Sequence, residues 1–218
     1  MPAEPPAAGR GYFITFEGGE GAGKTTQLER LALWLEARGL EVVRTREPGG
    51  TPGAEAVRRL LVEGAAERWL PSTELLLVAA ARDDHLARLI RPALARGAWV
   101  LCDRYIDSTF AYQASAGGLD PARIHALHEV VLDAPLPDLT LLLDLPVETG
   151  LARRHAEGAS TRFDAREHAF HERVRRGFLD RAAAAPERIA IVDAARAADD
   201  VAADLRRQVT VRLGLVAP

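Results

Sequence analysis

The sequence predicts an α/β fold in three layers, a five-stranded parallel sheet with helices on both faces. Five short apolar segments alternate with segments of helical periodicity, and one of them, 99–103, is an apolar run of the kind that is buried on both faces. Such alternation builds a parallel sheet, because each helix carries the chain back to the edge where the next strand starts.

The predicted strands are short and rich in aliphatic, β-branched or aromatic residues. The first ends at Gly18, and the second runs into the turn-rich loop "PGGTPG" at 48–53. Ligands of such sheets bind beyond the carboxyl ends of the strands, so the loops that follow them are the places to look for function. The strands are expected at 11–18, 40–47, 99–103, 139–145 and 188–194.

Helices are expected between the strands, where apolar residues recur on one face. Residues 25–38 place leucines on one face, and Gly39 can end that helix. Ser72 is expected to cap a long helix through 73–90, which Pro92 kinks or restarts. The other helices are expected at 54–63, at 120–133 with Asp120 as its N-cap and Pro121 in its first turn, at 147–157, at 165–184 and from about Asp199.

Length and composition indicate one soluble globular domain. The 218 residues show no internal repeat and no long linker, so we expect a disordered Pro- and Ala-rich tail at 1–10, unlike a signal peptide, and a single domain at 11–214. A net charge of −3 argues against nucleic-acid binding, and the longest apolar run, 75–81, is far shorter than the roughly 20 residues that span a membrane. Cys102 has no partner for an intramolecular disulfide, which favours the cytoplasm.

One glycine-rich segment carries the strongest chemical signal. It matches G-x-x-x-x-G-K-[ST] between a strand and a helix, the context in which backbone N–H groups and a lysine bind nucleotide phosphates. An incidental glycine-rich turn is the alternative. The predicted phosphate-binding residues are Gly18, Gly19, Glu20, Gly21, Ala22, Gly23, Lys24, Thr25 and Thr26.

Thr25 and Asp103 form a predicted Mg²⁺ site. In a P-loop the hydroxyl after the lysine ligates Mg²⁺, and Asp103 ends an apolar strand as a Walker-B aspartate does. Asp103 could instead cap the next helix. It is followed by Arg104 and not by a second carboxylate, and no "LSGGQ"-like segment is present, which argues against a transporter ATPase. Because the chain has no Asn, it cannot hold the N-K-x-D motif of a GTPase, which leaves a small-molecule kinase of the P-loop NTPase fold as the simplest interpretation.

Six segments together resemble the bacterial thymidylate kinase (dTMP kinase) family. They are "FEGGEGAGKTT", "REPGGT", "AAARDDHLARLIRPAL", "CDRYIDSTFAYQ", "PDLTLLLDL" and "TRFD", and the resemblance runs from about Tyr12 to about Gln208. It implies phosphorylation of dTMP to dTDP by ATP for dTTP synthesis, with Mg²⁺ and a homodimer. The alternatives are another nucleoside monophosphate kinase, for UMP/CMP or GMP, or a non-enzymatic P-loop nucleotide switch.

The resemblance also implies roles around the acceptor nucleotide. Arg58 and Arg104 would bind the acceptor phosphate, and Arg82 would hydrogen-bond the thymine carbonyl. Tyr112 would lie under the deoxyribose, where a 2′-hydroxyl would collide, and Glu20 would sit near the sugar 3′-hydroxyl or the phosphate. The loop facing the acceptor and the base edge would be formed by Glu47, Pro48, Ser108, Thr109 and Gln113.

A lid is expected at about 153–166. The P-loop has no basic residue at Gly21 or Ala22, so the chain resembles family members whose catalytic arginine comes from the lid, here Arg153 or Arg162. Such a group stabilises charge on the transferring phosphoryl and acts with Lys24, Arg104 and Glu20. Other candidates are weaker: the pairs His125/His128 and His168/His171 lack a third metal ligand and suit exposed helix faces, and Cys102 suits a buried inert thiol.

Val78 occupies the position where the family usually has a Phe that stacks on thymine. Phe110 could supply that stacking instead. Since stacking on an aromatic ring is worth about 1–3 kcal/mol per base, we expect Val78→Phe to lower the KM for dTMP in steady-state assays. A higher KM or a dead enzyme would contradict this view of the pocket.

Overall fold

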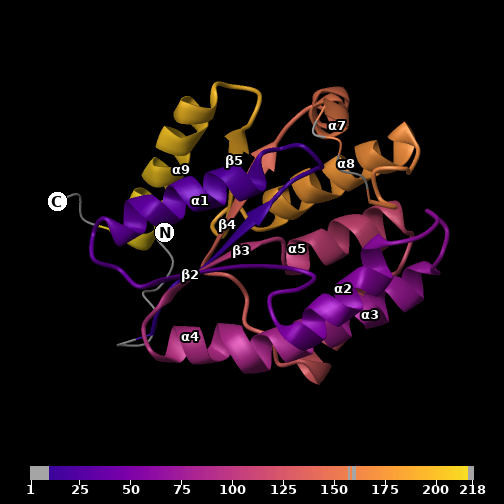
Figure 1. Ribbon diagram of the computed structural model, residues 1–218, viewed down its shortest axis with the longest axis horizontal. Helices are drawn as coiled ribbons and strands as arrows, with labels where there is room; N and C mark the ends of the chain where they lie inside the picture. Colours follow the sequence, from indigo (N-terminus) through magenta and orange to yellow (C-terminus); the bar gives the residue numbers. More distant parts are fainter. Residues whose placement is uncertain (1–9, 157, 159–160, 216–218) are drawn as a thin grey trace.

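A computed structural model describes residues 10–156, 158 and 161–215, and it has a parallel sheet at its centre (Figure 1). The order β2–β3–β1–β4–β5 puts β1 in the middle, and every neighbouring pair is parallel. The expected fold class is therefore confirmed. The strands are β1 (Phe13–Glu17), β2 (Val42–Arg46), β3 (Trp99–Asp103), β4 (Leu139–Asp144) and β5 (Ile189–Asp193).

Two helices cover one face of the sheet, α1 (Lys24–Glu36) and α9 (Ala198–Leu213). The predicted leucine face of α1 is buried there, against Ile14 and Phe16 of β1. Because successive side chains of a strand point to opposite faces, Phe13, Thr15 and Glu17 of the same strand face the other layer. That alternation is what brings Glu17 under the site described below.

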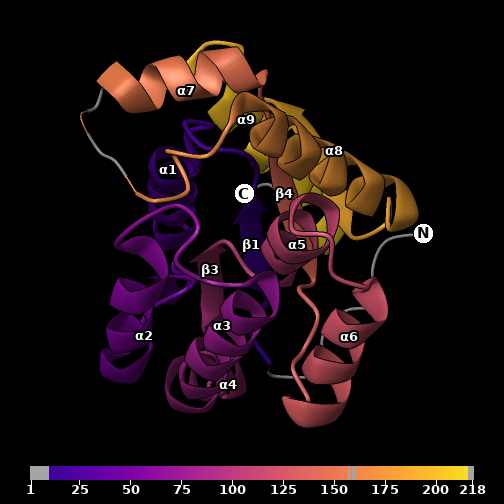
Figure 2. The same cartoon turned by 90° about the vertical axis from the view of Figure 1, so that its right-hand side faces the viewer.

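The second face carries more helices, and its first ones derive from the long apolar segment that the sequence analysis identified. They are α3 (Pro71–His85), its π-helical continuation η1 (Leu86–Ile90), α4 (Arg91–Ala95), α5 (Ile106–Thr109), the π-helical η2 (Phe110–Ala116), α6 (Pro121–Ala126), the π-helical η3 (Leu127–Val131) and α8 (His168–Ala184). Two further helices, α2 (Pro52–Val62) and α7 (Val147–Ala156), lie on opposite sides of β1, with α7 at the top of Figure 2 and α2 at the bottom.

One expected helix cap is wrong and another is confirmed. The helix α3 begins at Pro71, one residue before Ser72, and no side chain caps it; proline suits a first helical position because it has no N–H to leave unpaired. Asp120 does cap α6, since its carboxylate accepts a hydrogen bond from the Ala122 N–H at 2.9 Å. Pro92 lies at the start of α4, where it restarts the helix. No helix among the described residues is long and apolar enough to cross a membrane.

A buried polar network lies between the sheet and its second layer. The Thr15 and Thr140 hydroxyls of β1 and β4 are 2.8 Å apart, and Asp107 of α5 accepts two hydrogen bonds from Arg188, at 2.7 and 2.8 Å. Arg181 of α8 donates to the same carboxylate at 3.0 Å. Asp107 therefore ties α5, α8 and the start of β5 together under the sheet.

Glu17 is a fully buried carboxylate at the end of β1 that holds the turn after β3. It accepts hydrogen bonds from the backbone N–H groups of Tyr105 and Ser108, at 2.8 and 3.2 Å, and from the Ser108 hydroxyl at 2.6 Å. This turn includes Arg104 at φ 70°, a left-handed conformation that a non-glycine residue adopts only when its surroundings impose it. Glu17 therefore fixes the direction in which Arg104 leaves the sheet.

Burial gives Glu17 a measurable pH signature. Desolvation, together with the charge of Asp107, raises its pKa to about 7. Between its unfolded pKa, roughly 4.3, and 7, the folded protein holds a proton that the unfolded chain has released, so the free energy of unfolding must fall as pH rises through this window. The expected loss is about 4 kcal/mol, and it should be absent in Glu17→Gln.

Urea unfolding of both proteins at several pH values from 4.5 to 8 measures this effect, because contributions common to both proteins cancel in the difference. A wild-type-minus-variant difference that stays constant with pH would contradict the assignment.

Candidate active site

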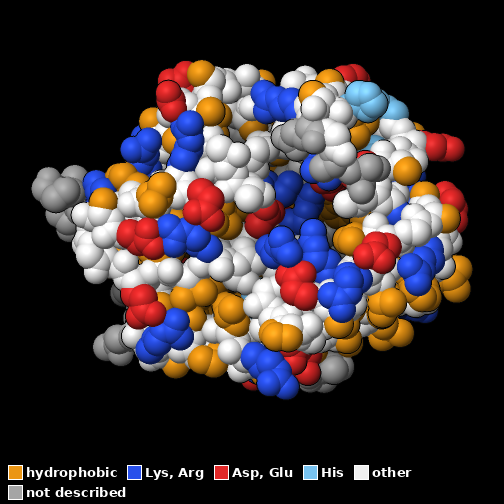
Figure 3. Space-filling model, in the orientation of Figure 1, with side chains coloured by type: hydrophobic (Ala, Val, Ile, Leu, Met, Phe, Trp, Pro, Cys, Tyr) orange, Lys and Arg blue, Asp and Glu red, His pale blue; other side chains and the backbone are white. Residues whose placement is uncertain are grey.

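One cavity of about 630 Å³ opens at the carboxyl ends of the central strands. Figure 3 shows Lys and Arg side chains gathered in a hollow on this face of the molecule. The cavity brings together nearly all the residues that the sequence analysis singled out: Glu20, Gly21, Ala22, Gly23, Lys24, Thr25, Thr26, Glu47, Pro48, Arg58, Val78, Arg82, Asp103, Arg104, Ser108, Thr109, Tyr112 and Gln113. Gly18 and Gly19 form the inner part of the same loop, whereas Arg153 and Arg162 do not line the cavity.

The P-loop runs from the end of β1 to the start of α1 and folds around Lys24. The Lys24 ammonium donates to the carbonyl oxygens of Gly18 and Gly19, at 3.2 and 2.8 Å. Burial and the nearby Arg104 lower its pKa. Gly21 has a positive φ of 67°, and a Cβ there would lie 2.1 Å from the Gly150 carbonyl oxygen, so only glycine fits.

Thr25 and Asp103 meet across the gap between α1 and β3. The Thr25 hydroxyl donates to the Asp103 carboxylate at 2.8 Å. A hydroxyl and a carboxylate oxygen this close are the hard oxygen donors that Mg²⁺ prefers. The donor set therefore fits the predicted metal.

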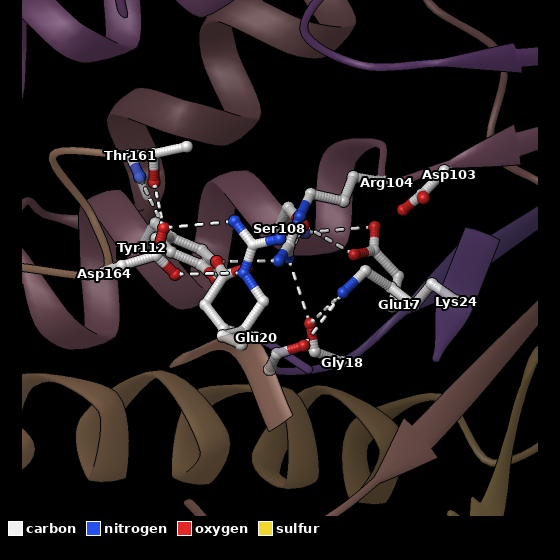
Figure 4. A network of polar contacts seen from close by, with 12 residues as sticks. Glu17, Gly18, Glu20, Lys24, Asp103, Arg104, Ser108, Tyr112, Thr161 and Asp164 are labelled. Atoms are coloured by element: carbon white, nitrogen blue, oxygen red, sulfur yellow. Dashed lines mark hydrogen bonds and ion pairs between the residues drawn. The ribbon is translucent and has the colours of Figure 1, made fainter. Parts of the chain in front are cut away.

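Glu20, Arg104 and Tyr112 form the polar wall next to the P-loop (Figure 4). The Glu20 carboxylate accepts from Arg104 Nη2 at 2.9 Å and from the Tyr112 hydroxyl at 2.7 Å, while Arg104 Nη1 donates to Ser108 at 3.2 Å. Burial works to raise the pKa of Glu20, but Arg104, Lys24 and the Tyr112 hydroxyl outweigh it and lower the pKa to about 2. Glu20 is therefore an anion at neutral pH.

A second buried pair lies deeper, between the end of β2 and α3. Arg82 donates through Nε to Glu47 at 2.8 Å and through Nη2 to the Thr109 hydroxyl at 3.1 Å. The other Glu47 oxygen faces His85 Nδ1 at 3.2 Å. Among the described residues Arg82 Nη1 has no hydrogen-bond acceptor, and Arg82 lines the cavity, so this nitrogen can donate to a ligand.

Arg58 reaches the cavity from α2. Its Nη1 donates to the Pro48 carbonyl oxygen at 2.8 Å, which connects α2 to the loop after β2. Burial, together with the nearby charge of Arg46, lowers the pKa of Arg58. Arg58 and Arg104 both line the cavity, and the charge of Arg104 also lowers the pKa of Arg58, so the two predicted phosphate ligands share one space.

The lid segment meets the cavity through residues that the sequence analysis did not select. Arg154, Thr161 and Phe163 line it, and Arg154 Nη2 donates to Asp164 at 3.1 Å. Arg153, one position away on α7, instead donates to the Ala194 carbonyl at 3.4 Å. Adjacent helical residues differ by about 100° in direction, and here Arg154 lines the cavity whereas Arg153 does not.

Arg162 is buried at 3% exposure, away from the cavity. It donates to the Leu61 carbonyl, to the Ala66 carbonyl at 2.9 Å and to the Glu74 carboxylate at 2.5 Å. These three bonds occupy all three of its nitrogens. In this arrangement Arg162 anchors the lid segment to α2 and α3 and does not reach toward phosphates.

Two other expectations are wrong and one is confirmed. Phe110 does not line the cavity: it is buried against His125 and Arg181, and Phe163 supplies the additional aromatic surface by packing edge-on against Tyr112. His128 and His171 are buried, not exposed, and they pack against the rings of Tyr105 and Phe170 respectively. Cys102 is buried as expected, and desolvation raises the pKa of its thiol.

Besides Thr161 and Phe163, sequence reasoning missed Glu17, Glu74 and Arg154. Glu17 and Glu74 carried a signal, since each is a lone carboxylate within an apolar segment, "FITFEG" and "TELLLVAA". A charge in such a position requires a partner when it is buried. No comparable signal separates Arg154 from Arg153.

Comparison with known proteins gives a single answer. A model of the thymidylate kinase family matches residues 16–205. The thymidylate kinase of Caulobacter vibrioides is 56% identical over 206 residues, covering 94% of this chain and 99% of that protein. One from Pseudomonas fluorescens is 57% identical, covering 85% and 89%.

A solved structure agrees with this sequence similarity. The crystal structure of thymidylate kinase from Ehrlichia chaffeensis superposes with a TM-score of 0.72 at 36% identity, covering 91% of this chain and 98% of that one. Both the match of the whole P-loop domain and the high identity over nearly the full length lead to one conclusion: the chain belongs to the thymidylate kinase family.

Proposed function

We propose that this protein transfers the γ-phosphoryl group of ATP to the phosphate of dTMP, giving ADP and dTDP for dTTP synthesis. The observation that carries the proposal is that one cavity joins two anion-binding halves, the P-loop with Lys24 and the wall with Arg58 and Arg104. An acceptor monophosphate is already an anionic nucleophile at pH 7, because its second pKa is about 6. The reaction therefore needs positioning and positive charge more than a general base.

The P-loop holds the donor. Its backbone N–H groups and the N-terminus of α1 face the β- and γ-phosphates, and Lys24 exchanges the carbonyls of Gly18 and Gly19 for phosphate oxygens. Thr25 and Asp103 would hold Mg²⁺, which neutralises phosphate charge when bound. ATP and Mg²⁺ are thus the expected cofactors.

The wall opposite the P-loop holds the acceptor. Arg58 and Arg104 bind its phosphate, and Glu20, an anion fixed by Arg104 and Tyr112, accepts a hydrogen bond from the sugar hydroxyl. Tyr112 closes the space under the sugar. Arg82, through its remaining Nη1, and the residues Val78, Ser108, Thr109 and Gln113 surround the base, with Glu47 and Pro48 shaping the loop beside it.

Arg154 is the lid arginine that the geometry favours for the transferring phosphoryl group. It lines the cavity, and its charge contributes to the low pKa of Glu20, whereas Arg153 and Arg162 bond to backbone carbonyls elsewhere. A positive group brought by the lid, as part of a segment at about 153–166, would compensate for the absence of a basic residue between the P-loop glycines.

We also propose a cytoplasmic homodimer built from single domains over 11–214. Large leucines are exposed at the start of α3 and in the segment between η3 and β4: Leu70 at 71%, Leu76 at 62% and Leu136 at 55%. Such a surface is the kind that a second copy of the chain covers. Cys102 is a buried free thiol and not part of a disulfide, which suits the reducing cytoplasm.

Coupled ADP-release assays over a panel of monophosphates test the function. We expect dTMP to stimulate turnover far more than UMP, CMP or GMP, and Lys24→Ala to abolish it while thermal melting shows an intact fold. Equal stimulation by UMP would favour another nucleoside monophosphate kinase, and no stimulation by any monophosphate would favour a nucleotide switch.

Arg154→Ala should lower kcat about 10³-fold, the lower end of the effect of an arginine finger, with a small change in the KM for dTMP. Arg153→Ala is the matched comparison on the same helix, and we expect its loss to be smaller. Single-turnover rates of both variants at saturating ATP measure these losses. A larger loss for Arg153→Ala would restore the role that the sequence suggested for that residue.

A further inference from the structure

Glu74 connects three parts of the molecule, although neither motif nor family position marked it. It lies in the first turn of α3 at 5% exposure. One carboxylate oxygen accepts from Arg162 Nη2 at 2.5 Å, and the other accepts from Gln113 Nε2 at 3.0 Å. Arg166 approaches the first oxygen to 3.8 Å.

The bond to Gln113 determines which end of its side-chain amide faces the cavity. An ionised carboxylate only accepts hydrogen bonds, so the Gln113 NH₂ must point to Glu74 and its oxygen Oε1 must point away. Among the described residues no group donates a hydrogen bond to Gln113 Oε1, and Gln113 lines the cavity. The protein therefore presents a fixed acceptor there, in place of an amide that could turn over.

The bond to Arg162 determines where Glu74 itself lies. Arg162 is held on its other nitrogens by carbonyl oxygens of the segment after α2, and its backbone N–H donates to the Val62 carbonyl at 3.1 Å. Its guanidinium also covers the ring of Phe163 at 4.4 Å, and Phe163 lines the cavity. The Glu74 carboxylate thus holds the lid segment in place through Arg162 and also orients the Gln113 amide.

We propose that Glu74 is a positioning residue that fixes the Gln113 amide with its oxygen toward the cavity, and thereby favours a monophosphate whose base presents a ring N–H. Thymine and uracil carry such an N–H at N3, whereas cytosine has a bare acceptor nitrogen there. Two acceptors facing each other cannot bond, and a buried polar group left unpaired is what makes such sites selective. The inference rests on the proposed function, with Gln113 at the base.

Glu74→Gln tests the proposal, because a neutral amide can donate or accept and lets Gln113 turn over. We expect the ratio of kcat/KM for dTMP to that for dCMP to fall at least about tenfold, mainly through KM for dTMP, with kcat changed less. Glu74→Asp keeps an acceptor-only group and should retain most of the selectivity, which a purely structural role would not predict.

Asp204→Asn is the matched control. Asp204 is also a buried carboxylate bonded to two arginines, Arg196 and Arg207, but it lies on α9 outside the cavity. We expect Asp204→Asn to lose about as much thermal stability as Glu74→Gln, while its ratio of kcat/KM for dTMP to that for dCMP stays unchanged. A folded Glu74→Gln protein whose ratio stays within threefold of wild type would overturn the proposal.

A failure of the proposed function is distinguishable, since the wild-type protein would then not be stimulated by dTMP at all. If Glu74→Gln does not fold, amide proton exchange in the wild-type protein still tests the proposal. The protons of the Gln113 side-chain NH₂ should exchange with water more slowly than those of a glutamine in a short peptide. NMR measures this exchange, and the chain has only three glutamines to assign. Fast exchange would refute the bond on which the proposal depends.

Discussion

The carboxylate of Glu17 sets the geometry on which the two halves of the cavity depend. It ends β1, directly before the P-loop, and it receives the N–H groups of Tyr105 and Ser108 in the turn after β3. Glu17 therefore helps to position both the P-loop, which holds the phosphate donor, and Arg104, which binds the acceptor phosphate. Burying a carboxyl group is costly unless its hydrogen bonds are satisfied, and here three donors satisfy it while it holds Arg104 at a positive φ.

Glutamates recur in and near the cavity, each buried or partly buried and paired with an arginine. Glu20 pairs with Arg104, Glu47 with Arg82 and Glu74 with Arg162. Such pairs fix long side chains before any ligand arrives, which reduces the conformational entropy lost on binding. They also limit the mutual repulsion of many cations in a small space. Arg82 and Arg104, which line the cavity, are held on one side by their carboxylates, whereas Arg162 is bonded within the protein through all three nitrogens.

Sequence reasoning succeeded where a local pattern has a single structural solution. The P-loop, the strands and the base-side motifs are contiguous, so spacing alone predicts where their side chains meet. It failed where the outcome depends on a direction in space: Arg153 and Arg154 are adjacent in sequence, and only the rotation of α7 against the sheet selects one for the cavity. Phe110 likewise lies outside the cavity because η2 turns it into the second layer, and Phe163, for which the sequence analysis made no prediction, lines the cavity. Arg162 was unpredictable for another reason, since its partners Leu61 and Ala66 are about 100 residues away and are backbone carbonyls that have no sequence signature.

Lys24, the lone lysine of this arginine-rich chain, illustrates how strongly the loop geometry restricts its side chain. Its ammonium lies inside the P-loop at 8% exposure, with carbonyl oxygens of Gly18 and Gly19 within 3.2 Å. An ammonium is a compact charge with three rotatable donors, whereas a guanidinium is a planar fork that must stay flat. Gly21 and Gly23 turn the backbone through positive φ to close around that small group, and a fork of arginine's size would force the loop open. The position therefore requires lysine for steric reasons, although a positive charge alone could have come from arginine as it does elsewhere in the cavity.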